Sequence, residues 1–500
     1  MQLVAYGAQD IYLTGNPQIT FFKVVYRRHT NFSMEAISQT INGSSVLSDS
    51  STTGTVTVSR NGDLVHNVYV RVNANDDTDC ISGDQLINTV ELEIGGQRID
   101  KHTREWLQVW AELSTPESKA AGYKYLTGGF SNTLMAGNTD ATDGRHGQQS
   151  VMVPLQFWFC RNPGLALPLI ALQYHEVKMK FTWGTKAEVS RDGSAYSTAP
   201  TCEVWVDYIY LDTDERRRFA QQSHEYLIEQ LQYSETSAAA TKKIKLNLNH
   251  PVKELVWTNK TADIVAQKAK LTLNGHDRFS EQTREYFQVR QPLDNHTAVP
   301  GYNIKETEKP QMTNPIHTGA LTHHATAASA IGVAILAVGS VTVSADLQAA
   351  TPIRVGDVLS ISVGNIDETD HGADAVNHHL VQVASVSDDT DPVCSFVTAI
   401  AAGSIHSGLG TGAGLTIDII GRVQDPKSRC SQLAKDVNVY SFALKPEEHQ
   451  PSGTCNFSRI DSAYLEFSAN TGSTGVITVY AVNYNVLRIM SGMGGLAYSN

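Results

Sequence analysis

Among the residues of this chain that could do chemistry, the histidines have the spacing most similar to that of a metal site. The adjacent pairs His323–His324 and His378–His379, with His371 nearby, carry imidazoles that could ligate a metal ion. Neighbouring side chains on a strand point to opposite faces, however, and the His-x-His spacing of metal-binding sandwich enzymes occurs nowhere. We therefore interpret these histidines as solvated loop residues, and we expect neither a metal nor another cofactor.

Two Arg-Glu pairs occur at like positions in the two halves of the chain, where they resemble active-site charges. They are Arg104–Glu105 and Arg284–Glu285, and each follows a Thr. Their recurrence indicates instead a repeated structural role, such as a buried or interfacial ion pair. The chain has no Gly-x-Ser-x-Gly elbow, no P-loop and no His-Glu-x-x-His motif. We therefore expect no catalytic residue and no enzyme activity.

A short basic stretch near the N-terminus is a weak signature of nucleic-acid binding. It runs from Lys23 to His29 and interleaves basic side chains with Tyr26. The formal net charge of the whole chain is −12, however, and binding by counterion release requires clustered Lys and Arg. We favour an extended arm that anchors the first strand, and we expect no direct contact with nucleic acid.

Asn-x-Ser/Thr sequons mark possible N-glycosylation sites. Asn42, Asn259 and Asn295 are the candidates, and Asn31 and Asn456 also fit the pattern. The opening MQLVAYGAQDIYLTG lacks the basic n-region and the apolar h-region of a secretory signal. We therefore expect most of these sequons to be incidental.

The bulk composition predicts a two-domain β-protein. A length of 500 residues suits two domains, and 41% hydrophobic with 18% charged residues is typical of globular chains. The six cysteines form no CxxC pair, which favours a reducing compartment. The longest stretch of low polarity, Ile331–Val343, is shorter than the roughly 20 residues of a membrane span.

An internal duplication divides the chain into two like halves. The first match has a constant offset of 188 residues, and the second has an offset of 180 at its Thr-Arg-Glu triplets. The matching segments are VTVSRNGDLVHNVYV (56–70) with IKLNLNHPVKELVWT (244–258), and LEIGGQRIDKHTREWLQV (92–109) with LTLNGHDRFSEQTREYFQV (271–289). Because both matches occur in the same order, each half is expected to fold in the same way.

Alternating apolar and polar residues predict strands in both halves. The clearest cases are Val177–Trp183, Cys202–Leu211 and Val476–Val486. Many short strands in two copies, separated by Gly, Asn and Pro, indicate an all-β fold of two antiparallel sandwiches. We assign an N-terminal arm to residues 1–35, the first sandwich to 36–215, a polar linker to 216–232 and the second sandwich to 233–500.

One segment breaks the duplication, and we assign it to residues 311–426. A Phe lies four residues before a Pro in each half, Phe159 before Pro163 and Phe442 before Pro446. From the Thr-Arg-Glu triplet to this Phe there are 56 residues in the first half and 159 in the second. Between Gly319 and Ile420 there are ten acidic residues and a single basic one, Arg354. Five strand-like runs predict a small β-module inserted into a surface loop, at 340–344, 358–363, 380–386, 394–400 and 415–420.

Four long blocks closely resemble the major capsid proteins of nucleocytoplasmic large DNA viruses, the group that includes phycodnaviruses, mimivirus-like viruses and iridoviruses. They occur in family order along the whole chain, at Tyr6–Glu35, Phe157–Val177, Tyr440–Asp461 and Ala481–Asn500. Within these blocks and the duplicated segments, eight residues form our structural signature: Pro17, Arg27, Arg104, Glu105, Pro163, Arg284, Glu285 and Pro446.

The resemblance implies two tandem eight-stranded jelly rolls in a chain that forms homotrimers. Six sandwiches per trimer would give a pseudo-hexagonal capsomer, and capsomers would tile the outer icosahedral shell of the virion. The implied partners are neighbouring capsomers, minor capsid and penton proteins, and the inner membrane side of the capsid. By the same analogy the protein is made and assembled in the host cytoplasm, and the 311–426 insert forms an external tower.

Two other functions also fit a tandem sandwich. A carbohydrate-binding protein, such as a lectin or a spike, could use Tyr and Asp in the loops of its sandwiches. A metalloenzyme of the cupin type would hold iron, manganese or zinc inside one of them. Persistent monomers would favour the lectin, and a stoichiometric metal would favour the enzyme.

Overall fold

The computed structural model describes most of the two sandwiches and the strands of the insert. The described residues are 7–73, 81–128, 150–190, 199–237, 243–259, 268–300, 317–321, 340–342, 358–363, 379–386, 393–396, 415–421, 430–431, 433, 436–468 and 476–498.

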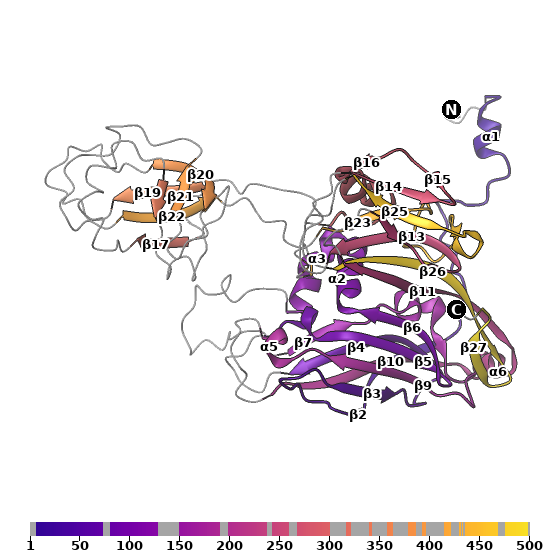
Figure 1. The fold of residues 1–500 in the computed structure, drawn as a ribbon. Helices are drawn as coiled ribbons and strands as arrows, with labels where there is room; N and C mark the ends of the chain where they lie inside the picture. The colour runs from indigo at the N-terminus through magenta and orange to yellow at the C-terminus, as the bar shows by residue number, and fades with distance from the viewer. Residues whose placement is uncertain are drawn as a thin grey trace.

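The first sandwich consists of two antiparallel sheets around one apolar core (Figure 1). One sheet has the order β1-β10-β4-β7 and the other β2-β3-β9-β5-β6, while the short β8 (Leu167–Pro168) pairs with β4. The strands are β1 (Phe32–Gln39), β2 (Ile41–Gly43), β3 (Thr53–Thr57), β4 (Leu64–Asn73), β5 (Ile87–Ile94), β6 (Gln97–Thr103), β7 (Ser150–Pro154), β9 (Val177–Trp183) and β10 (Thr201–Leu211). In β9 the residues alternate as predicted, and Val177, Met179, Phe181 and Trp183 are buried.

The second sandwich is built in the same way (Figure 1). Its sheets have the orders β11-β26-β13-β23 and β12-β25-β14-β15. The strands are β11 (His224–Ser237), β12 (Lys243–Lys245), β13 (Pro251–Asn259), β14 (Lys268–Leu273), β15 (His276–Asp277), β23 (Asn438–Ser441), β25 (Ala463–Phe467) and β26 (Val476–Met490), with β16 (Gln282–Thr283), β24 (Cys455–Asn456) and β27 (Met493–Leu496) at the margins.

Both sandwiches have the strand order of a jelly roll. Without the short strands β2 and β8, the first sandwich has eight described strands. Without the marginal strands β16, β24 and β27, the second sandwich also has eight. In each, one sheet contains the first, eighth, third and sixth strands in that order, and the other contains the second, seventh, fourth and fifth. The predicted tandem of two jelly rolls is confirmed, and the identical order in the two halves agrees with the sequence duplication.

Few helices interrupt the strands, and most are short. They are α1 (Asp10–Thr14), α2 (Arg104–Ser114), α3 (Glu117–Leu126), α4 (Trp158–Arg161), α5 (Lys186–Val189), α6 (Thr213–Gln221), the π-helical turn η4 (Tyr286–Arg290) and α7 (Gln291–Asn295), with 3-10 turns η1 (Gly83–Gln85), η3 (Pro163–Leu165) and η7 (Phe457–Arg459). None of the helices in the described part of the chain has the length and apolarity needed to cross a membrane.

The predicted linker at 216–232 is shorter in the structure. Helix α6 ends at Gln221 and β11 begins at His224, so the second half of the predicted linker is a strand. In the sequence, the polar residues of this segment do not show the alternation that predicts a strand. β11 nevertheless pairs with β26 over its whole length, from His224 to Ser237, and that backbone pairing outweighs the weak local pattern.

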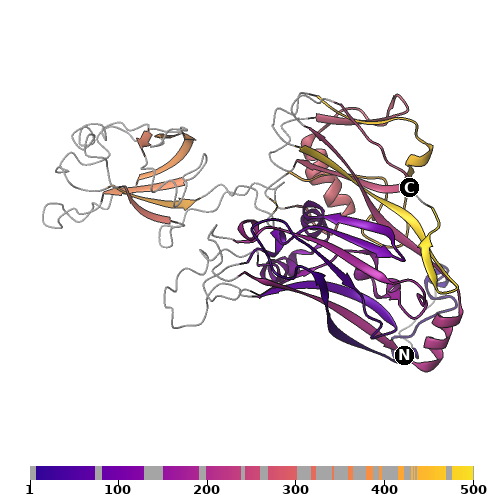
Figure 2. The same ribbon diagram turned by 60° about the horizontal axis from the view of Figure 1, so that its bottom comes forward.

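The insert forms a separate β-module that stands apart from both sandwiches in Figures 1 and 2. Its strands are paired in the order β17-β22-β19-β20-β21-β18. They are β17 (His317–Leu321), β18 (Ser340–Thr342), β19 (Val358–Val363), β20 (His379–Val386), β21 (Val393–Phe396) and β22 (Leu415–Gly421). The five predicted runs each overlap a strand, whereas β17 was not predicted.

From Gly7 to Thr30, every residue of the N-terminal arm is exposed except Asp10, which is partly buried. It contains the short helix α1, whose residues are not buried. Strand β1 begins at Phe32, within the range that we assigned to the arm.

Candidate functional site

The two sandwiches meet along a buried seam, and its apolar part is formed by helix α2 of the first sandwich. Trp106, Val109, Trp110 and Leu113 lie on one face of α2, at helical spacing, and are buried. They pack on the outer face of the second sandwich against Val256, Leu433, Val437, Val439, Tyr480 and Val482. The ring centroids of Trp106 and Tyr480 are 5.3 Å apart. This contact removes a large aromatic surface from water and joins the two sandwiches.

Helix α2 is positioned by the residue that ends β6. Thr103 is its N-cap, and its hydroxyl accepts a hydrogen bond from the backbone N–H of Trp106 at 3.4 Å. The same hydroxyl lies 3.2 Å from the hydroxyl of Tyr480. Burial raises the pKa of Tyr480, so this phenol stays neutral. Thr103 thus fixes both the start of the helix and its contact with the second sandwich.

The seam also contains buried charges that come from both sandwiches. The Arg161 guanidinium of α4 donates a hydrogen bond to Glu229 of β11 over 2.7 Å. The other carboxylate oxygen of Glu229 lies 2.7 Å from the Lys253 ammonium, whose side chain is fully buried. Burial lowers the pKa of Lys253, although Glu229 opposes that change. One carboxylate therefore holds a cation from each sandwich.

A second ion-paired group lies beside the first, within the second sandwich. His296 Nε2 is 3.0 Å from Glu254, and His296 Nδ1 is 2.9 Å from Glu447. Burial alone would lower the pKa of His296, but the two carboxylates outweigh it and raise the pKa to about 9. His296 and Lys253 lower the pKa of Glu254, although burial opposes that change.

The six charges are balanced when His296 is protonated. Arg161, Lys253 and His296 then carry three positive charges against the three carboxylates that they contact. Because an unpaired buried charge is strongly unfavourable, this neutrality is what allows the group to remain in the seam.

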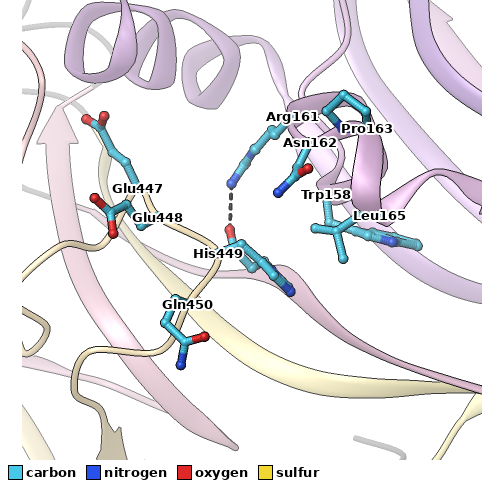
Figure 3. Close-up of a pocket in the computed structure, with 10 residues that line it drawn as sticks. Trp158, Arg161, Asn162, Pro163, Leu165, Glu447, Glu448, His449 and Gln450 are labelled. Carbon is cyan, nitrogen blue, oxygen red and sulfur yellow. Dashed lines mark hydrogen bonds and ion pairs between the residues drawn. The ribbon is translucent and has the colours of Figure 1, made fainter. Parts of the chain in front are cut away.

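A cavity of about 520 Å³ opens beside these ion pairs (Figure 3). It lies between the α4–η3 segment, which supplies Trp158 and Arg161, and the loop that supplies Glu447, Glu448 and His449. The lining carboxylates are all ion-paired, Glu229 with Arg161, Glu447 with His296 and Glu448 with Lys445. These are the compensated charges of a structural junction. Among the described residues, His, Cys, Asp and Glu do not gather in a group of three that could hold a metal ion.

Glu112 of α2 anchors the chain where it returns from the insert. Its Oε1 accepts hydrogen bonds from the backbone N–H groups of Cys430 and Ser431, at 3.0 and 2.7 Å, and from the Ser431 hydroxyl at 2.9 Å. Glu112 is 1% exposed. The residues that follow the insert are thus tied to the first sandwich, although they belong to the second half of the chain.

The two predicted Arg-Glu pairs have different surroundings. Arg104 is half-buried and pairs with Glu188 at 3.1 Å, where it holds the pKa of that carboxyl below its usual value. Its partner is therefore Glu188 rather than the adjacent Glu105. Arg284 and Glu285 are both exposed, so they form no buried pair within this chain, and an interfacial role stays a prediction.

The four other signature residues lie in two places. Pro17 and Arg27 are exposed in the N-terminal arm. Pro163 begins the turn η3 and lines the cavity, while Pro446 is buried directly before Glu447. The two prolines of the matching Phe-to-Pro segments therefore border the same junction from opposite sides.

The glycosylation candidates differ in accessibility. Asn42 is exposed on β2. Asn295 is partly buried, and its amide donates a hydrogen bond to the Gln291 carbonyl at 3.0 Å. Asn259 is 1% exposed within β13, so it is wrong as a glycan acceptor because a glycan requires a solvated amide. His323, His324, His371 and His378 lie outside the described residues, and His379 is the first residue of β20.

The sequence analysis missed the charged part of the seam. Lys253 and Glu254 are adjacent charges within an otherwise apolar strand, and that interruption is a signal that we could have used. His296 had no comparable signal, because its partner Glu447 lies 151 residues further along the chain.

Comparisons with known proteins agree with this architecture. Residues 20–212 match the family model described as the major capsid protein N-terminus. Residues 215–268 and 431–495 match the model described as the large eukaryotic DNA virus major capsid protein. The interval between the last two segments contains the β-module, so the insert lies outside the matched parts.

Curated relatives and solved structures cover nearly the whole chain. The major capsid protein of Pyramimonas orientalis virus is 43% identical over 100% of this chain and 99% of that one. The major capsid protein of Paramecium bursaria Chlorella virus 1 is 37% identical over the same shares. The crystal structure of PBCV-1 VP54 has a TM-score of 0.59 and 31% identity, covering 96% of this chain and 100% of that one. This chain therefore belongs to the major capsid proteins of large eukaryotic DNA viruses, a family of structural proteins rather than enzymes.

Proposed function

We propose that three copies of this chain form a pseudo-hexagonal capsomer that tiles the outer icosahedral shell of a large double-stranded DNA virus. The supporting observation is that one chain contains two jelly rolls with the same strand order. A ring of three chains then presents six similar units and approximates sixfold symmetry. A solved PBCV-1 virus capsid model contains a chain with a TM-score of 0.58 and 30% identity to this one.

The proposed location follows from membership of the family. The capsomer lies in the virion shell after synthesis and assembly in the host cytoplasm, and its neighbours are other capsomers, minor capsid proteins and penton proteins. The arm (1–35) and the bases of the sandwiches face the inner membrane side, and the 311–426 module forms an outward tower. Weak polar contacts between capsomers allow assembly errors to be corrected, while their number makes the shell stable.

Native mass spectrometry and negative-stain microscopy test the proposed capsomer. We expect a species of three chains, each of 54.5 kDa, with a hexagonal outline. Persistent monomers at micromolar concentration would contradict it and favour the carbohydrate-binding alternative. Elemental analysis of the same sample tests the metalloenzyme alternative, which requires a stoichiometric metal.

A further inference from the structure

Each sandwich carries a copy of the helical face that builds the seam. At a constant offset of 180 residues, REWLQVWAEL (104–113) aligns without a gap with REYFQVRQPL (284–293). The second segment is also helical, as η4 followed directly by α7. The seam residues and their counterparts are Trp106 with Tyr286, Val109 with Val289, Trp110 with Arg290, and Leu113 with Leu293.

The two copies of this face differ in what covers them. In the first sandwich Leu113 is fully buried against the second sandwich. Its counterpart Leu293 is 67% exposed. Arg290, the counterpart of the buried Trp110, has a side chain that is 71% exposed. Within the described part of the chain, Arg290 and Leu293 therefore lack the cover that Trp110 and Leu113 have.

The surface that receives α2 also has a counterpart, on the outward face of the equivalent strands of the first sandwich. In the second sandwich a row of paired residues crosses the sixth, third, eighth and first strands, namely Val439, Val256, Tyr480 and Tyr233. Helix α2 packs on the first three of them. In the first sandwich Pro154, Tyr69, Trp205 and Ser38 form a row that crosses the same four strands. Val68, Val70, Val204 and Val206, which flank Tyr69 and Trp205 in the sequence, lie in the core, so the two aromatic side chains face outward, as Val256 and Tyr480 do in the second sandwich.

The first-sandwich row is open within the part of the chain that the structure describes. Tyr69 and Trp205 stack side by side, with ring centroids 6.5 Å apart and an interplanar angle of 3°. Both rings are partly exposed, and neither belongs to a buried cluster of the described residues. A flat aromatic surface of this kind is suited to a helix that brings apolar and guanidinium groups.

The replacement of Trp110 by Arg290 fits that aromatic surface. An arginine already lies against an aromatic ring in the seam, where the Arg161 guanidinium is 3.7 Å from the Trp110 ring centroid. In the first-sandwich row the Glu203 carboxylate accepts a hydrogen bond from the Trp205 indole at 3.1 Å, so an acidic group lies beside the ring. Arg290 would therefore meet both a π-face and a carboxylate.

We propose that the helical segment 286–295 of one copy packs on Tyr69 and Trp205, on the outer face of β4 and β10, in a second copy of this chain. This inference rests on the proposed trimer and names the surfaces that join its chains. The two surfaces differ, so the contact is head-to-tail, and such a contact forms a closed ring when the rotation permits it. The seam within the chain and the contact between chains then alternate around six sandwiches.

Two substitutions test the contact from its two sides. Leu293→Lys alters the helical segment, and Trp205→Glu alters the aromatic row. Each should raise the dissociation constant of the trimer at least about 30-fold, as substitution of a central interface residue commonly does. Leu444→Lys is the matched control, because Leu444 is 76% exposed in the same sandwich but lies outside both surfaces. The control should remain trimeric, and thermal melting should show that all three variants fold.

A mixture of the two variants gives the sharpest result. The Leu293→Lys chain keeps an intact aromatic row, and the Trp205→Glu chain keeps an intact helical segment. Together they can form one contact but cannot close a ring, so native mass spectrometry should show a one-to-one heterodimer. If the wild type is trimeric and both variants remain so at its concentration, this inference is overturned while the proposed trimer stands. A monomeric wild type would overturn both.

Discussion

The apolar and charged parts of the seam lie next to each other but contribute in different ways. The α2 face meets the second sandwich through Trp106 and its apolar neighbours, and burial of that surface is favourable in itself. Arg161, Glu229 and Lys253 gain attraction inside the protein but lose their hydration. Stability should therefore come mainly from the apolar part.

What the charged part adds is a requirement for complete pairing. Glu229 must meet Arg161 from one sandwich and Lys253 from the other, so a displaced sandwich would leave a buried charge alone. Such a penalty disfavours other relative positions of the two sandwiches. The apolar part therefore holds the seam together, whereas the charged part selects the relative position of the two sandwiches.

Trp106→Ala should give the largest loss, because it removes an indole that is 1% exposed at the centre of the apolar part. Large-to-small changes of this kind cost about 3–5 kcal/mol of unfolding free energy, including the cavity that they leave. Denaturant unfolding followed by circular dichroism measures the loss. Leu444→Ala, at an exposed leucine, is the control and should change stability by no more than about 0.5 kcal/mol. Equal losses in both variants would refute the assignment of stability to the apolar part.

Lys253→Met should have the next largest effect, because it leaves Glu229 with only the Arg161 partner in a buried site. We expect a loss of about 3 kcal/mol in the same unfolding experiment. Adding Glu229→Gln to Lys253→Met removes the excess negative charge and should recover part of that loss. Lys445→Met breaks the exposed pair with Glu448 and should cost less than about 1 kcal/mol. A double variant that is less stable than Lys253→Met alone would mean that the loss of stability does not come from the excess charge on Glu229.

Elements of the fold with a local sequence pattern could be predicted, whereas contacts between residues distant in the sequence could not. Period-2 runs identified strands such as Val177–Trp183, and they placed five of the six described strands of the insert, because alternation reflects burial of one face. The first part of β11, 224–232, falls in the predicted linker, since its polar residues hide a pattern that only pairing with β26 reveals. The duplication predicted two like sandwiches.

The seam could not be predicted in the same way. The matching segments at Arg104 and Arg284 are alike in sequence, yet Leu113 is buried in the seam while its counterpart Leu293 is exposed. That difference depends on where the second sandwich lies relative to the first. Lys253, Glu254 and His296 come together only in the folded chain, and no spacing rule connects them.

Alkaline pH should produce the smallest of these effects, through His296. Its pKa is raised from 6.5 to about 9, so its stabilising contribution is complete below about pH 6.5 and is lost as the pH rises through 9. Since one pKa unit corresponds to about 1.4 kcal/mol, stability should fall by about 2–3 kcal/mol between pH 7 and pH 10. Because burial also lowers the pKa of Lys253, the wild type alone does not isolate the histidine. His296→Gln supplies the comparison, because it retains a polar side chain that does not titrate. The pH-dependent difference in unfolding free energy between the two proteins measures the ion pairs with Glu254 and Glu447, and a constant difference across this range would show that His296 is uncharged in the seam.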